Sequence, residues 1–592
     1  KQRLMIQTIN LMNKTFHHIW SKAWVAILAL AMTSCSDFLE VDPLNDITLE
    51  KFWNEKNDVD NVVNGCYSAL QSQACISRLM CWGEFRSDNI QGGTNIDNNQ
   101  DLSNILKENI NASNGFTDWT CIYKVINDCN TVIYYAPTVA KKDPNYTQSE
   151  LRATVAEMSA LRDLCYFYLI RTFRNVPFTK QPYLDDTQKM DLPATPFNDV
   201  LDSLIVDLES VKGNAVRKYP QTNRYSQRGR ITQNAIYAML SEMYLWKKDY
   251  QNAVAYADKV INAMTQDYQN ELDKKGGTVS EDEQMQDGYP LISDRLGSTY
   301  GMAFNSIFGD GNSRESIFEL IYMNDNSQLA NGAVSSNYGN SETFPGLVKP
   351  SDYLGDDFTK DNPTVFLTKY DTRYYTSLEA LGATSYGIGK YTQGTGMVMV
   401  TPPTSATSKG TVSYGSHWAP NYCHANWILY RLTDVMLMKA EALVQLVNND
   451  DTTAAGKTVN DSLLHEAYNI VNVINKRSNC STTKTDINYA SYASKSLMAD
   501  LVMDERHREL LFEGKRWYDL VRRSLRDGNT SYLTSQASKK STGSAGSASQ
   551  NKLKRIDAIF WPYNKNELQV NKNLQQNPAF GNGENSSYET TK

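Results

Sequence analysis

The stretch DERHRELLFEGKRWYDLVRR (504–523) places a histidine among arginines and glutamates, residue types that can bind a metal or transfer protons. A helical zinc site of the HExxH type needs a second histidine four residues later, and position 511 is a leucine. If 503–521 is one helix, His507 lies in a single stripe with Met503, Leu510, Gly514, Trp517 and Val521. We therefore predict that His507 packs against the protein and has neither a catalytic nor a metal-binding role.

The charged residues of this stretch lie outside that stripe, which predicts a solvent-facing side of the helix crossed by salt bridges. Opposite charges four residues apart stabilise a helix by a few tenths of a kcal/mol, about 0.2–0.5 per pair. The expected pairs are Asp504–Arg508, Lys515–Asp519 and Asp519–Arg523.

Other catalytic patterns are missing from the sequence. There is no Gly-x-Ser-x-Gly elbow, and GIGKYTQGTG (387–396) is glycine-rich but lacks the Gly-Lys-Ser/Thr ending of a phosphate loop. Glycoside hydrolysis needs two carboxylates at a set separation, but 66 acidic residues without a local motif say little. We predict a protein that is not an enzyme and binds no cofactor; the sequence indicates no metal-ligating residues and leaves open whether a structural ion is bound. A glycan-cleaving surface enzyme is the alternative from another functional class.

The composition excludes one class of partner. The 592 residues carry a net charge of −7, with 41% apolar residues and a mean hydropathy of −0.51. Binding nucleic acid requires a basic face that displaces counterions, so we predict no nucleic-acid partner. Aromatic residues make up 11% of the chain, and a hydrophilic chain with 35 tyrosines has rings available for surfaces as well as for the core.

Residues 14–35 have the order of an export signal. Lys14 and Lys22 precede the apolar run 23–32, which is too short to span a bilayer, and the small residues Thr33 and Ser34 come before Cys35. This ending resembles a bacterial lipobox. We predict a signal peptide over 1–34 and a lipidated Cys35 that anchors the mature protein in the membrane. An ordinary signal peptide with an incidental cysteine is the alternative.

The other eight cysteines form no CxxC pair, which disfavours zinc and thioredoxin-like sites. An exported chain can form disulfides, but one of this length does not need them, and the sequence leaves their state open. Three cysteines lie in helix-like stretches, where we expect small buried thiols: Cys121, Cys129 and Cys165.

Helix-period segments recur along the chain and predict a mainly α fold. They cover residues 52–72, 116–136, 148–174, 196–212, 229–248, 250–266, 425–446, 461–478 and 495–525. The pair at 230–261 matches a tetratricopeptide repeat at Tyr237, Leu240, Ser241, Tyr244 and Ala253, although Ala257 and Val260 depart from its pattern. A second, degenerate pair is predicted at 428–446 and 465–479.

Two segments interrupt this pattern. Residues 267–424 are rich in Gly, Ser, Asn, Thr and Tyr, and so long a segment favours a functional insertion. SQASKKSTGSAGSASQNK (535–552) is low in complexity and predicts a mobile loop.

DERHRELLFEGKRWYDLVRR closely resembles the C-terminal helix of the SusD/RagB family of Bacteroidetes outer-membrane lipoproteins. Further resemblances follow in family order along the chain: CSDFLEVDP (35–43), FWNEKNDVDNVVNGCYSAL (52–70), EMSALRDLCYFYLIRTFRNVPF (157–178), LYRLTDVMLMKAEAL (429–443) and WPYNKNELQVNKNLQQNP (561–578). The resemblance implies one SusD-like domain over 35–592, with a tetratricopeptide-like scaffold of helical pairs and a loop-rich insertion.

The same resemblance implies a function. Family members are lipid-anchored at the cell surface, lie over a SusC-like TonB-dependent transporter, and bind an oligosaccharide or, in the RagB branch, a peptide. We expect glycan binding, with peptide binding as the alternative within the family. These motifs belong to the scaffold and do not identify the ligand.

The ligand-contacting residues have to be sought by their chemistry. A sugar ring has an apolar C–H face and a fringe of hydroxyls, so its sites combine flat aromatic rings with amides and carboxylates. We predict Trp418 and Tyr300 as stacking residues because glycine or proline interrupts the regular structure around each. The further candidates are Trp82, Asp88, Asn89, Asn95 and Tyr338.

Overall fold

The computed structural model describes residues 52–220, 224–276, 279–322, 329–339, 344–355, 365–381, 386–405, 408–419, 422–483, 485–541 and 543–581. The predicted signal peptide and Cys35 lie outside the described residues. The chain divides into two units, 1–54 and 55–592, and every element named below belongs to the second. No helix in the described ranges combines the length and apolar character needed to cross a membrane.

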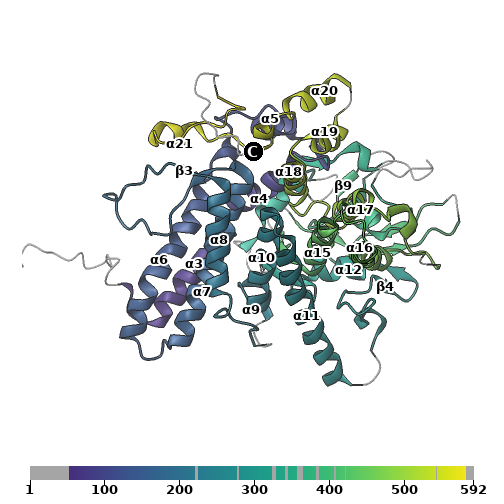
Figure 1. The fold of residues 1–592 in the computed structure, drawn as a ribbon, viewed down its shortest axis with the longest axis horizontal. Helices are drawn as coiled ribbons and strands as arrows, with labels where there is room; N and C mark the ends of the chain where they lie inside the picture. Colours follow the sequence, from purple (N-terminus) through teal and green to yellow (C-terminus); the bar gives the residue numbers. More distant parts are fainter. Residues whose placement is uncertain are drawn as a thin grey trace, which may run out of the picture. The chain divides into compact units, whose positions relative to one another are not determined.

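In the first group of helices, shown together in Figure 1, each helix packs against the next one along the chain. The group consists of α3 (Lys56–Leu70), α6 (Thr120–Lys142), α7 (Gln148–Phe173) and α8 (Phe197–Val211). Helix α7 begins with a capping box in which Thr147 and Glu150 satisfy each other's backbone amides. Every residue from Ala156 to Phe173 is buried, as expected of a helix covered on all sides.

The second group contains two helical hairpins that pack on each other through α11 and α15 (Figure 1). They are formed by α10 (Gln233–Lys247), α11 (Tyr250–Lys275), α15 (Leu432–Leu446) and α16 (Ala454–Arg477). In the first hairpin the Ser241 hydroxyl donates to the Ala253 carbonyl over 2.9 Å, so the small residue permits close approach of the helices. The predicted mainly helical fold is thus confirmed, while the finer tetratricopeptide-like assignment stays a prediction.

Helix α15 starts later than the sequence pattern indicates. We predicted a helix from residue 425, but residues 427–431 form strand β14 (Trp427–Arg431), which pairs antiparallel with β6 (Ser316–Leu320). Every residue of both strands is buried, and a short continuous apolar run cannot be assigned to helix or strand by periodicity alone. This pair joins the loop-rich insertion predicted at 267–424, which we call the central segment, to the second helical group.

The central segment contains short strands and turns of helix. One sheet has the order β12-β11-β5-β4, made of Thr411–Ser413, Met399–Thr401, Thr299–Tyr300 and Arg295–Leu296. Two-stranded pairs are β8 (Leu378–Ala380) with β9 (Tyr386–Ile388), β10 (Gln393–Thr395) with β13 (Ser416–His417), and β1 (Ile90–Gly92) with β7 (Val348–Pro350). Strands β2 (Val176–Pro177) and β3 (Ala194–Thr195) pair beside the first helical group.

Apart from the two helices within residues 495–527, the remaining α-helices of the described residues are short. They are α4 (Gln73–Met80), α5 (Gln100–Leu106), α9 (Arg224–Gly229), α12 (Met302–Phe304), α13 (Gly332–Tyr338), α14 (Thr372–Ser377), α19 (Ser531–Ala537), α20 (Gly543–Lys552) and α21 (Lys565–Val570), with π-helical turns η2 (Cys81–Phe85) and η7 (Asn305–Asp310). The predicted loop at 535–552 is therefore wrong over most of its length, because α20 fills it. Next to α20, the Lys540 ammonium donates to the Phe85 and Arg86 carbonyls, contacts that composition does not reveal.

The opening stretch is not one helix. Helix α17 (Lys495–Glu509) and helix α18 (Arg516–Asp527) are separated by a turn in which Phe512 and Gly514 have positive φ angles of 66° and 70°. The Glu84 carboxylate accepts from the Phe512 and Gly514 backbone amides over 3.2 and 3.1 Å. A Cβ added at Gly83 would be 1.9 Å from the Gly514 carbonyl oxygen, so this approach of two backbones requires glycine.

The predicted solvent-facing charged side is also wrong. Glu509 is 2% exposed in its side chain and pairs with Arg431, Arg477 and Arg373 over 2.6, 2.5 and 2.9 Å. These three guanidinium groups hold the pKa of Glu509 well below its usual value against the opposing effect of burial. Other elements cover this side of the helix, which makes the ion pairs long-range.

In each of the three expected local pairs, the basic residue pairs with a different carboxylate. Arg508 pairs with Glu505 at 2.8 Å, Lys515 with Asp434 at 3.1 Å, and Arg523 with Asp500 at 2.7 Å. A carboxylate from another element, or one turn away, is closer in each case. We call the buried set Arg373, Arg431, Arg477, Glu505, Glu509 and Glu513 the ionic cluster.

Glu509→Ala tests the ionic cluster. The substitution leaves three buried guanidinium groups without their shared carboxylate, and we expect the free energy of unfolding to fall by about 3–5 kcal/mol. Lys124→Ala is the control, since it breaks the exposed Lys124–Asp128 pair and should cost less than about 1 kcal/mol. Urea unfolding followed by fluorescence measures both, and equal small effects would show that the cluster is not needed.

Candidate ligand-binding cavity

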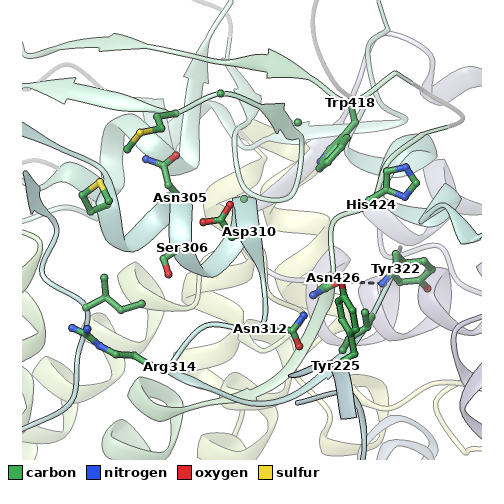
Figure 2. A pocket seen from close by; sticks show the side chains of 17 residues that line it. Tyr225, Asn305, Ser306, Asp310, Asn312, Arg314, Tyr322, Trp418, His424 and Asn426 are labelled. Carbon is green, nitrogen blue, oxygen red and sulfur yellow. Dashed lines mark hydrogen bonds between the residues drawn. The ribbon is translucent and has the colours of Figure 1, made fainter. Parts of the chain in front are cut away.

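A cavity of about 860 Å³ opens between the central segment, α9 and the start of β14. Figure 2 shows side chains from these elements pointing into it. The lining residues are Tyr225, Ile292, Met302, Asn305, Ser306, Gly309, Asp310, Asn312, Arg314, Ile321, Tyr322, Gly394, Gly396, Met397, Trp418, His424 and Asn426. This volume lies within the range of pockets that hold small ligands.

The π-helical turn η7 forms one wall of the cavity. Its first residue, Asn305, is fixed by two hydrogen bonds to Val398, whose amide donates to Oδ1 and whose carbonyl accepts from Nδ2, each over 2.8 Å. The wall ends at Gly311, whose φ is 64° and whose added Cβ would lie 2.3 Å from the Asn426 Nδ2. A wide turn of this kind is frequent at functional sites, and glycine is required where it closes.

The floor of the cavity is a fixed polar layer. The Asn426 amide donates to Glu319 Oε2 over 2.8 Å and accepts from the Tyr322 backbone amide over 2.9 Å, the contact dashed in Figure 2. The Asn312 backbone amide donates to the same Glu319 oxygen over 2.9 Å. Burial raises the pKa of Glu319, which lies beneath the floor on β6. The protein itself therefore fixes the orientation of the Asn426 amide.

Trp418 forms the upper rim and is half-buried. Its ring contacts His424 edge to face, with centroids 5.4 Å apart and an interplanar angle of 89°. Its backbone amide donates to the Thr392 carbonyl over 3.2 Å. A Cβ added at Gly394 would lie 2.9 Å from the Trp418 nitrogen, so the strand beneath the tryptophan needs glycine. These contacts hold the ring so that it points into the cavity (Figure 2).

Tyr225, from α9, lies on the opposite side of the cavity and is 45% exposed. Two charges complete the lining. Arg314 is held by the Tyr268 hydroxyl at 2.6 Å and the Leu291 carbonyl at 2.7 Å. Asp310 is exposed, and within the described ranges its carboxylate has no hydrogen-bond or ion-pair partner. The cavity thus combines the aromatic side chains of Trp418, Tyr225 and Tyr322 with oriented amides and one available carboxylate, which is the chemistry that recognises a sugar.

Of the predicted ligand-contacting residues, Trp418 alone lines this cavity. Tyr300 is 7% exposed on strand β5, where it pairs with Val400 and Arg295. Tyr338 is also buried, and its hydroxyl donates to the Phe512 carbonyl over 3.0 Å. The glycines next to these tyrosines lie at the ends of strands and of a helix: Gly297 follows β4, Gly301 follows β5 and Gly339 follows α13. Neither ring presents a free stacking face in this structure.

The N-terminal candidates belong to the core. Trp82 is 0% exposed, because CWGEF forms η2, and its indole nitrogen donates to the Phe116 carbonyl over 2.8 Å. Both Asp88 oxygens accept from Arg516, each over 2.9 Å. Burial raises the pKa of Asp88, but the Arg516 guanidinium outweighs this effect and holds it well below its usual value. Asn89 donates to Glu84 over 2.6 Å. Their proposed ligand contact is therefore corrected to a structural role.

Asn95 is exposed, with its amide 3.5 Å from the Pro345 carbonyl, and is not among the residues that line the cavity. His507 packs in the core as predicted, with Nε2 against the Asn89 side-chain oxygen, and burial lowers its pKa. In the described part of the chain, no group of three or more His, Cys, Asp or Glu residues is arranged to hold a metal ion.

The sequence interpretation missed most of the lining. Tyr225, Arg314, Tyr322 and Asn426 come from three separate segments, since Arg314 and Tyr322 flank β6, and no local pattern marks them. His424 follows Trp418 closely in the sequence, and this proximity to a predicted residue is a signal that could have indicated it.

Helical hairpins combined with a loop-rich segment that carries an open, amide-lined cavity define a helical scaffold with a site suited to ligand binding. The comparisons agree with this class. The model of the SusD family matches residues 264–580, and a second model, described as starch-binding associating with outer membrane, matches residues 37–245. The chain therefore belongs to the SusD family, a family of carbohydrate-binding proteins.

Individual relatives are distant but cover nearly the whole chain. SusD-like protein P38 from Formosa agariphila is 25% identical over 528 residues, which is 86% of this chain and 92% of the relative. A SusD superfamily protein from Bacteroides vulgatus superposes with a TM-score of 0.62 at 17% identity, covering 89% and 100% of the two chains. A laminarin-binding SusD-like protein gives 0.56 at 19% identity, again covering 89% and 100%. These structures share the fold.

Asp88→Ala tests whether this residue is structural. Removing the carboxylate leaves the buried Arg516 guanidinium uncompensated, so we expect the free energy of unfolding to fall by about 3–5 kcal/mol while ligand affinity stays unchanged. Asn95→Ala, at an exposed position, should change neither quantity. Urea unfolding and calorimetric titration measure the two effects. A stable Asp88→Ala protein with greatly weakened binding would return the residue to the ligand site.

Proposed function

We propose that this protein captures an oligosaccharide in the cavity between Trp418 and Tyr225 and passes it to a SusC-like TonB-dependent transporter. The observation that carries the proposal is the position of Trp418 at the cavity rim. Its ring packs edge to face against His424, and the cavity floor opposite it contains oriented amides. Membership of a carbohydrate-binding family supports the ligand class. Delivery to a transporter rests on the family resemblance.

The polar lining suits hydroxyl groups. Each of the Asn305 and Asn426 amides uses one donor and one acceptor on the protein, which leaves one of each for a ligand. Because the protein already fixes both amides, binding costs little of their side-chain entropy. Asp310 adds an acceptor that can take hydrogen bonds from sugar hydroxyls.

The same lining favours binding without cleavage. Hydrolysis of a glycosidic bond uses two carboxyl groups that flank the scissile bond. The cavity residues include a single acidic side chain, Asp310, while Glu319 lies below the floor and is occupied by Asn426 and the Asn312 amide. We therefore propose a binding protein rather than a glycan-cleaving enzyme.

Trp418→Ala tests the site. We expect about a thirty-fold loss of affinity, about 2 kcal/mol, because the stacking face is removed. The midpoint of thermal unfolding should be nearly unchanged, since the ring lies at the rim. Tyr422→Ala is the matched control, because Tyr422 is a 55% exposed aromatic residue nearby in sequence and does not line the cavity.

Calorimetric titration with a panel of oligosaccharides and peptides, followed by chromatography of the incubated ligands, measures these effects. Wild-type affinity in a folded Trp418→Ala protein would place the site elsewhere. Binding of peptides alone would overturn the glycan proposal, and accumulation of shortened glycans would overturn the proposed lack of catalysis.

We also propose that Cys35 is the lipid anchor at the outer-membrane surface, a location that the family model suggests. Cys35→Ala should move the protein from the membrane fraction to the soluble fraction, because the apolar run before it is too short to span a bilayer. Fractionation and immunoblotting in cells that lack the transporter provide the measurement. Continued sedimentation of the variant with membranes would contradict an anchor at this residue.

A further inference from the structure

Tyr391 has a backbone conformation that an aromatic residue rarely adopts. It lies in the turn between β9 and β10, and its φ angle is 67°. A residue with a Cβ is strained in this left-handed region, which glycine enters without cost. The residue is 1% exposed, so the turn is packed inside the protein. Backbone strain of this kind persists only where the surrounding structure imposes it, and it gathers at functional sites.

The Tyr391 side chain carries a second cost. Its hydroxyl is buried, and among the described residues it has no hydrogen-bond partner. A buried hydroxyl without a partner loses its bonds to water and gains none in the protein. The contacts of Tyr391 are therefore those of its ring and its backbone. A residue that violates two local rules is expected where function, rather than stability, requires it.

Neighbouring side chains fix the turn around Tyr391. The Lys390 ammonium donates to the Glu509 carbonyl and to Glu513 Oε1, each over 2.8 Å, which ties the turn to the ionic cluster. The Thr392 hydroxyl closes the turn by donating to the carbonyl of the last residue of β9 over 2.8 Å. The strained conformation is thus imposed from both sides of the residue.

The Tyr391 ring packs against two parts of the ligand cavity. It contacts Phe308 edge to face, with centroids 5.2 Å apart and an interplanar angle of 83°, and Phe308 is a buried residue of the η7 wall. It also contacts Trp427, with centroids 5.1 Å apart and an interplanar angle of 31°. Trp427 directly follows Asn426 of the cavity floor. One ring therefore supports both the wall and the floor.

The backbone that follows Tyr391 reaches the third part of the cavity. The Thr392 carbonyl accepts from the Trp418 amide over 3.2 Å, and Gly394, two residues further on, lines the cavity. The direction in which the chain leaves the turn depends on the φ angle of Tyr391. The wall, the floor and the rim are accordingly joined at this one residue.

We propose that Tyr391 is a positioning residue of the ligand cavity. Its ring sets the separation between the η7 wall and the floor at Asn426, and its left-handed backbone directs the following strand to the Trp418 rim. Tyr391 does not line the cavity itself. It holds the polar groups and the rim in place before a ligand arrives, as a rigid supporting layer does beneath a binding site. Such positioning matters only if the cavity binds a ligand, so this role rests on the proposed function.

Hydrogen exchange of the full chain without a ligand tests this role. Tyr391→Gly removes the ring and the backbone strain, so the wall (301–311) and the rim (413–418) should lose their support together. We expect the amides of both segments to exchange about tenfold faster, since a buried aromatic contact no longer opposes local opening. Tyr391→Phe keeps the ring, so both segments should exchange as in the wild type. Its midpoint of thermal unfolding should rise, because the unpartnered hydroxyl is gone.

Tyr166→Ala is the matched control. Tyr166 is an equally buried tyrosine on α7, where its ring packs on Tyr123 and Phe178 in the first helical group. The substitution should lower the midpoint of thermal unfolding and leave exchange at 301–311 and 413–418 unchanged. Loss of a buried ring elsewhere in the core is thereby separated from loss of the ring behind the cavity.

A spectroscopic signal reports on the rim directly. In protein labelled with 5-fluorotryptophan, the fluorine resonance of Trp418 is assigned by its absence from the Trp418→Phe protein. This resonance should shift in Tyr391→Gly and stay at the wild-type position in Tyr391→Phe and in Tyr166→Ala. Core filling alone would not move it selectively.

Unchanged exchange at 301–311 and 413–418 in a folded Tyr391→Gly protein would overturn the proposal. Faster exchange of these segments in Tyr166→Ala would overturn it as well, and so would faster exchange in Tyr391→Phe, which would transfer the role from the ring to the hydroxyl. If Tyr391→Gly does not fold, Tyr391→Leu, which retains an apolar side chain without a ring, carries the same expectations. None of these measurements uses a glycan, so their failure is distinguishable from a failure of the proposed binding function.

Discussion

Glu509 accepts ion pairs from three arginines that lie far apart in the sequence, and this buried contact joins α17 to β14, α16 and α14. Arg431 ends β14, Arg477 ends α16, and Arg373 belongs to the central segment. Burying one of these charges alone would be very costly, whereas the paired set roughly offsets its loss of hydration. The cluster therefore requires that helix, strand and insertion come together in a single arrangement.

The ionic cluster also fixes the strands that form the floor of the cavity. Arg477 also pairs with Glu315 at 2.9 Å, and the Glu315 carbonyl accepts from the Leu432 amide, so the end of the β6–β14 pair at which Ser316 faces Arg431 is fixed. Glu319 lies on β6, and Asn426 immediately precedes β14. The floor that orients the cavity amides is thus an extension of the same two strands. Rigid support beneath a site is what keeps its polar groups in place before a ligand arrives.

The aromatic side chains come from more exposed elements. Trp418 follows the short strand β13, and Tyr225 lies on the short helix α9. The scaffold can therefore stay constant while such residues change, which is consistent with a fold shared at 17% identity. Loops positioned by a rigid framework commonly carry binding residues. Family membership accordingly predicts the class of ligand better than the particular ligand.

The sequence by itself determined the helices whose period is local and long, such as α7, α10 and α11, and it carried enough motifs to predict the family. It could not determine which side chains are covered. Trp82 and Trp418 both lie close to glycines, yet one is buried in η2 and the other forms the cavity rim, because distant segments cover the first completely and the second only in part. The charged residues of 504–523 likewise suggested a solvent-facing side, because the sequence does not show which distant segments cover them. Their partners, residues 373, 431 and 477, are far away in the chain, and the pattern of a helix is identical whether water or an arginine faces it. Burial is a property of the packed fold, so tertiary structure alone decided it.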